Sequence, residues 1–154
     1  MKNRGMVFIS ILIVMILTLT ISCATTRQAI TEDEFYTYWT GTWINTDLHR
    51  SDWTPQKVVN HPTRTQDRYT APDMPKACTH PYIFKDVWKD SKGNIWYIAT
   101  SECYITPDTP IQEYGKINIT DNTYELIYTL SNDPIEEWEP DNPLYFHLIY
   151  YRSD

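Results

Sequence analysis

The sequence predicts an all-β fold: an eight-stranded antiparallel up-and-down barrel that follows an N-terminal signal segment. From Trp39 onward the chain is rich in Tyr, Trp, Thr, Ile and Val, which favour strands. Prolines, asparagines and aspartates interrupt it about every 8–15 residues. Between the interruptions, alternating side chains give each strand an inward and an outward face. A β-sandwich is the alternative fold.

Residues 1–22 have the layout of a secretory signal peptide. Lys2 and Arg4 form a positive start, and an almost wholly apolar run of 16 residues follows, from Met6 to Ile21. This run is shorter than the ~20 residues that a membrane-spanning helix prefers. An uncleaved N-terminal anchor and an ordinary signal followed by a chance cysteine are the alternatives.

The end of this segment resembles a bacterial lipobox. Ser22 occupies the small position before Cys23, although Thr20 stands where leucine is usual. The resemblance implies cleavage before Cys23 and attachment of a diacylglyceryl group to its thiol. It therefore implies a lipoprotein anchored to a membrane of the bacterial cell envelope, with its domain on the periplasmic or extracellular side.

The rest of the chain divides into a tether and one domain. Residues 23–35 lack clear apolar periodicity and predict a flexible tether, and residues 36–154 predict the barrel. The stretch from His61 to Pro81 contains four prolines and predicts a long covering loop with a short strand in its middle. Turns are expected around Gly93 and Asn122. The eight expected strands cover residues 38–47, 56–61, 67–71, 82–89, 94–105, 113–120, 123–131 and 144–152.

Closure of these strands into a ring removes exposed sheet edges. The first expected strand contains Gly41 and Trp43 in a Gly-x-Trp pattern, and Arg152 is the basic residue near the end of the last strand. This arrangement resembles that of lipocalin-like (calycin) barrels. The resemblance implies that Trp43 closes one end of the barrel and that Arg152 packs over its indole ring, which joins the first strand to the last.

The cysteines indicate an oxidising compartment. If Cys23 carries lipid, Cys78 and Cys103 remain, and a disulfide between them is expected in an exported protein. The alternative is a metal corner formed by Cys78 and His80, but the sequence shows no further ligands at suitable spacing.

The sequence contains no recognisable catalytic motif. It lacks a G-x-S-x-G elbow, a glycine-rich phosphate loop and an H-E-x-x-H helix. We therefore expect neither an enzyme nor a bound cofactor or metal. The net charge of −7 argues against nucleic-acid binding, which needs a basic face. The acidic run from Glu136 to Asp141 predicts a solvated loop, with a calcium site or a basic partner as the alternative.

A barrel lined by aromatic side chains favours the binding of a small, apolar ligand. Simple filling of the core is the competing interpretation. A second functional hypothesis is a non-catalytic protein-binding module of the envelope (an inhibitor, an adhesin or a structural lipoprotein) with Trp53 and Trp138 as exposed anchors. The candidates for the lining or mouth of a ligand cavity are Trp88, Trp96, Tyr97, Tyr104 and Tyr128.

Overall fold

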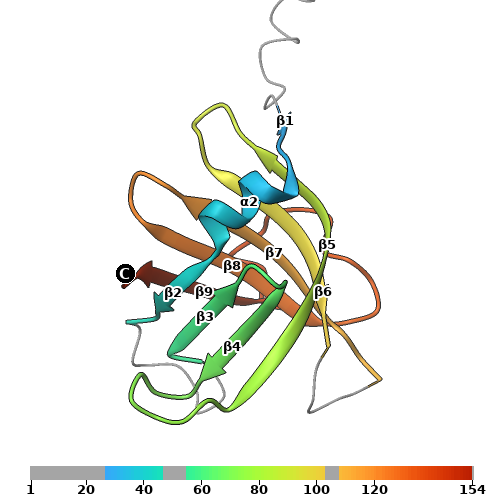
Figure 1. Ribbon diagram of the computed structural model, residues 1–154. Helices are drawn as coiled ribbons and strands as arrows, with labels where there is room; N and C mark the ends of the chain where they lie inside the picture. The colour runs from blue at the N-terminus through green and yellow to red at the C-terminus, as the bar shows by residue number, and fades with distance from the viewer. Residues whose placement is uncertain (1–26, 47–54, 103–107, 154) are drawn as a thin grey trace, which may run out of the picture.

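The computed structural model describes residues 27–46, 55–102 and 108–153, and it confirms the predicted barrel (Figure 1). A short strand, β1 (Gln28–Ala29), and a helix, α2 (Glu32–Trp39), precede the ring. In this part of the chain, no helix is both long and apolar enough to cross a membrane. The barrel strands are β2 (Gly41–Ile44), β3 (Lys57–His61), β4 (Thr65–Tyr69), β5 (Cys78–Lys89), β6 (Ile95–Ser101), β7 (Ile111–Asn118), β8 (Thr123–Leu130) and β9 (Phe146–Arg152).

The ring closes between its first and last strands. Each strand from β2 to β9 pairs antiparallel with the next one in the chain, and β2 also pairs with β9. In the closing ladder Trp43 lies opposite Arg152, and Ile44 lies opposite Tyr151. Consecutive strands are therefore neighbours throughout, which is the up-and-down arrangement. The additional strand β1 pairs with the end of β5.

The covering loop predicted between His61 and Pro81 is shorter than expected. Its predicted middle strand is present as β4, which begins at Thr65, but β5 begins at Cys78 rather than near residue 82. Pro81 is tolerated in β5 because it is the last residue that pairs with β4, and the ladder with β6 begins only at Tyr82. A proline at the junction of two ladders removes little of the pairing.

The flexible tether predicted for residues 23–35 is also wrong in its described part. Besides β1, this region contains the start of α2, where the Thr31 hydroxyl accepts a hydrogen bond from the Glu34 amide at 3.1 Å. Acidic residues occupy the first turn of the helix, where their negative charge stabilises the positive end of the helix dipole. Phe35 and Trp39, four residues apart, share one face of α2 and are fully buried.

Helix α2 makes the two ends of the barrel different. It covers the end at which the short turns 62–64, 90–94 and 119–122 lie, and we call this the closed end (Figure 1). The opposite end, with the longer connections 70–77 and 131–145, is called the open end. The inner face holds an apolar core against which Phe35 and Trp39 pack. A second, separate apolar cluster lies on the outer face of β5–β8.

Candidate functional site

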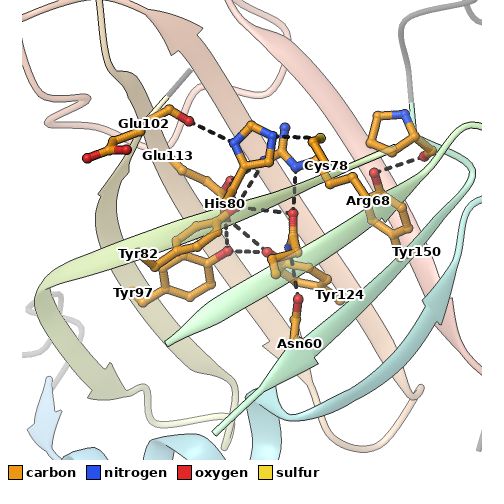
Figure 2. Close-up of polar contacts among 12 residues, drawn as sticks. Asn60, Arg68, Cys78, His80, Tyr82, Tyr97, Glu102, Glu113, Tyr124 and Tyr150 are labelled. Carbon is orange, nitrogen blue, oxygen red and sulfur yellow. Dashed lines mark hydrogen bonds and ion pairs between the residues drawn. The ribbon is translucent and has the colours of Figure 1, made fainter. Parts of the chain in front are cut away.

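A buried carboxylate lies at the centre of the barrel. Glu113 is fully buried, and its carboxylate accepts hydrogen bonds from the hydroxyls of Tyr82 and Tyr124, both at 2.9 Å, and of Tyr97 (Figure 2). Arg68 Nη2 lies 3.8 Å from Glu113 Oε2 and donates to Tyr82 Oη at 3.0 Å. We call these five residues the interior polar cluster. They come from β4 to β8, so a single carboxylate connects five consecutive strands from inside the ring.

The cluster is connected to α2 by further hydrogen bonds. Arg68 Nε donates to Gln66 Oε1 at 2.8 Å, and Gln66 Nε2 donates to Asn60 Oδ1 at 2.8 Å. The Asn60 amide donates to the Trp39 carbonyl at 3.1 Å. The Trp43 indole donates to the same carbonyl, also at 3.1 Å. The last carbonyl of the helix is thus satisfied by side chains of the barrel, which positions α2 on the closed end.

Burial and the charges of neighbouring groups determine which members of this cluster are ionised. Burial, followed by the charge of Glu113, raises the pKa of Tyr82, Tyr97 and Tyr124 well above the ordinary value. Burial opposes the charge on Arg68, but Tyr82 and Glu113 raise its pKa above the usual range. The three tyrosines are therefore neutral donors at neutral pH, and the guanidinium remains charged.

One glycine makes the central contact sterically feasible. The ring of Tyr97 lies against the backbone of β7 at Gly115, and a Cβ atom at this position would overlap the ring and its hydroxyl. Tyr97 and Gly115 are register partners in the β6–β7 ladder. Only a residue without a side chain therefore lets the Tyr97 hydroxyl reach Glu113.

His80 lies on β5 nearer the open end and is neutral. Its Nδ1 donates to the Glu102 carbonyl at 2.8 Å, which leaves Nε2 as an acceptor 3.0 Å from Cys78 Sγ. Burial and the charge of Arg68 lower the pKa of His80 to about 4, and the Glu102 carbonyl only partly opposes this shift. Among the described residues no three metal-ligating side chains come together, here or elsewhere. The predicted disulfide partner Cys103 lies outside the described residues.

At the open end, exposed apolar side chains occupy inward-facing positions. Tyr128 and Phe146 are register partners whose rings stack with centroids 4.8 Å apart. Phe146 is 53% exposed and Leu130 is 44% exposed, although both continue the inward-facing alternation of their strands. Leu130 lies opposite the buried Ile111. We call Ile111, Tyr128, Leu130 and Phe146 the apolar rim.

The structure separates the residues predicted to line a cavity. Tyr97 is fully buried in the core, and Tyr128 belongs to the apolar rim. The assignment of Trp88 and Trp96 to the barrel lining is wrong, because both belong to the outer cluster, where their rings stack with centroids 6.2 Å apart. Tyr104, like Cys23 and Trp53, lies outside the described residues.

The outer cluster explains the position of these tryptophans. Trp138, in the 131–145 connection, packs edge-on against Trp96 with ring centroids 5.3 Å apart, and Tyr114 also contacts both rings. The Lys116 ammonium lies 5.5 Å from the Trp96 ring and 5.2 Å from the Trp138 ring. Trp138 is thus packed against the barrel wall and is not the exposed anchor that we predicted.

Gly41, Trp43 and Arg152 lie at the closed end. The Arg152 guanidinium carbon is 5.3 Å from the centre of the Trp43 ring. Gly41 starts β2 with a φ of 143°, one residue after the helix C-cap Thr40. Comparison of the chain with protein-family models, curated proteins and solved structures gives no match.

Proposed function

We propose that this protein is a lipoprotein of the bacterial cell envelope whose lipocalin-like barrel binds a small, largely apolar ligand at its open end. The membrane anchor is a lipid group on Cys23. Support for the anchor comes from the sequence alone: the positive start, the apolar run and the small residue Ser22 before the cysteine.

The observation that carries the ligand-binding proposal is the asymmetry of the two ends. At the closed end, Phe35 and Trp39 of α2 fill the barrel and are fully buried. At the open end, Leu130 and Phe146 occupy inward-facing positions and remain exposed. Covering such surface contributes about 25 cal/mol per Å², so an apolar molecule gains free energy by occupying this end.

A buried hydroxyl group indicates one polar feature of the ligand. Ser101 is 3% exposed, and its Oγ has no hydrogen-bond partner within the described residues. Ser101 lies opposite Ile111, which lies opposite Leu130, so the hydroxyl adjoins the apolar rim. Leaving such a group unsatisfied costs about 1–3 kcal/mol. A carbonyl or hydroxyl group on the ligand would satisfy it.

The charges inside the barrel favour an uncharged ligand. Arg68 is 3.8 Å from Glu113, so each buried charge already has an opposite charge beside it. A ligand anion or cation would have to compete with this pair and lose its own hydration. The ligand class is therefore an apolar molecule with one neutral polar group.

Binding of a neutral fluorescent probe such as Nile red tests the site. We expect the Phe146→Ser and Leu130→Ser variants to raise the Kd about tenfold each, since each removes about 1–2 kcal/mol of apolar contact. Ile83→Ser is the matched control, because Ile83 is 68% exposed at an outward position of β5. Equal losses in all three variants would mean that the probe binds the surface non-specifically.

Native mass spectrometry of protein purified from its own envelope provides an independent test. A co-purifying small molecule supports the proposal, whereas a stoichiometric protein partner would select the protein-binding hypothesis instead. The anchor is tested separately with labelled palmitate. Incorporation should be lost in the Cys23→Ala variant, and label that persists in this variant would refute lipidation at Cys23.

A further inference from the structure

The N-terminal part of the described chain is fixed to the closed end of the barrel. In β1, Gln28 pairs with Lys89 and Ala29 pairs with Trp88, at the last residues of β5. The Arg27 guanidinium lies 4.3 Å from the centre of the Trp88 ring and 3.7 Å from the Asp86 carboxylate. Strand β1 thus lies at the same end as α2 (Figure 1).

The direction of β1 is equally informative. Because β1 is antiparallel to β5, Gln28 is paired with Lys89 nearest the turn 90–94, and β1 runs from there toward the open end. The first described residues, Arg27 and Gln28, therefore lie at the closed end.

The distance from the proposed lipid to this strand is short. Cys23 is five residues before Gln28, and a fully extended chain of this length spans at most about 18 Å. Strand β5 contains 12 residues between Cys78, near the open end, and Lys89. Its length is about 36 Å at ~3.3 Å per residue. Cys23, the residue that carries the proposed lipid, therefore cannot reach the open end while β1 remains paired.

We infer that the closed end faces the membrane and that the open end, with its apolar rim, faces away from it. The inference depends on the proposed lipid anchor. Exposed apolar side chains at the rim would favour the inverted orientation, in which Leu130 and Phe146 contact lipid. The short distance that the chain can span between Gln28 and Cys23 argues against this inverted orientation. A ligand of the rim is consequently exchanged with the aqueous space or with a partner located there, and not directly with the leaflet that holds the anchor.

Energy transfer to the membrane surface tests this orientation. A donor dye is attached to Ser91→Cys, in the closed-end turn 90–94, or to Asp73→Cys, in the open-end connection 70–77; both residues are exposed. The lipidated protein is reconstituted in vesicles that contain a rhodamine-labelled lipid. The parent protein is labelled in parallel to measure any reaction of the native cysteines. Because the two sites are separated by roughly the length of β5, we expect transfer about twofold or more higher from position 91.

The outcomes separate this inference from the proposed anchor. If the protein is retained on vesicles through Cys23 but transfer from position 73 equals or exceeds that from position 91, the orientation is wrong and the anchor stands. If retention does not depend on Cys23, the anchor is wrong and the orientation falls with it.

A linker variant tests the role of chain length. Insertion of about twelve Gly and Ser residues between Thr26 and Arg27 adds flexible chain before β1. We expect the difference in transfer between positions 91 and 73 to shrink. An unchanged difference would show that a short connection does not orient the barrel.

Discussion

Arg152 lies directly opposite Trp43 in the ladder that closes the barrel, with its guanidinium carbon 5.3 Å from the centre of the indole ring. Its Nη2 also donates to the Thr40 carbonyl at 3.1 Å. Strands β2 and β9 are the first and last of the ring, so this one side chain joins the two ends of the sheet.

Replacement of Arg152 should therefore weaken closure. We expect Arg152→Ala to lower the free energy of unfolding by about 1–3 kcal/mol, through loss of the cation–π contact and the hydrogen bond. Arg152→Lys should lose less, because it retains the charge but not the planar guanidinium. Urea denaturation followed by tryptophan fluorescence measures both. Unfolding of the alanine variant at the parental urea concentration would contradict this role.

The interior polar cluster should be strongly coupled. Glu113→Gln leaves Arg68 buried without a negative partner and should cost about 3–5 kcal/mol. The double variant Glu113→Leu, Arg68→Met should be less destabilised than the sum of its single variants by at least about 1 kcal/mol. Additive losses in this double-mutant cycle would show that the two charges do not stabilise each other.

A matched surface carboxylate provides the control for that cycle. Glu125 lies on the outer face of β8, with an ion pair to Lys116 and a hydrogen bond of 2.9 Å to His147. It is partly solvent-exposed, so Glu125→Gln should cost no more than about 1 kcal/mol. A loss as large as that of Glu113→Gln would mean that burial is not the source of the difference.

The barrel could be predicted from the sequence because its strands alternate and its turns are marked. The pattern of Gly41 and Trp43, together with Arg152 near the C-terminus, also predicted which strands close the ring. Helix α2 was missed because it is short. Its signals, Thr31 three residues before Glu34 and Phe35 four residues before Trp39, are present in the sequence and are typical of a capped amphipathic helix.

The candidate site was less predictable. The sequence alternation predicts Trp88 on the same face as Tyr82 and Phe84, but a register shift between Phe84 and Asp86 turns it to the outer face. Its register partner Trp96 lies on the same outer face. On the outer face these rings are covered by Trp138, which comes from the distant 131–145 connection. Glu113 was overlooked, although it falls between Ile111 and Gly115 in the inward alternation of β7. Its three tyrosine donors come from other strands, and single-sequence patterns do not report such contacts.

Gly115 should not tolerate even a methyl group. A Cβ atom would overlap the Tyr97 ring and displace its hydroxyl from Glu113, so Gly115→Ala should destabilise the protein by about 1–3 kcal/mol. In a Tyr97→Leu background the ring is absent, and the same substitution should cost clearly less. Thermal unfolding of the four proteins in this cycle provides the measurement. An equal cost in both backgrounds would place the strain elsewhere than at the Tyr97 ring.

His80 should make stability depend on pH in the acidic range. Its pKa is about 4 in the folded protein and 6.5 for an ordinary histidine. Well above pH 6.5 the imidazole is neutral in both states, and its contribution to stability is fully present. As the pH falls toward 4, the unfolded chain binds a proton that the folded protein does not, so this contribution is lost. The loss amounts to about 3 kcal/mol between these limits.

Urea unfolding between pH 7 and pH 4 measures the effect, and His80→Gln is the comparison, because glutamine retains an amide donor for the Glu102 carbonyl but does not titrate. The parent should lose about 3 kcal/mol more than the variant as the pH is lowered, since other titrating groups are common to both. Parallel curves would mean that the buried imidazole binds a proton as readily in the folded barrel as in the unfolded chain.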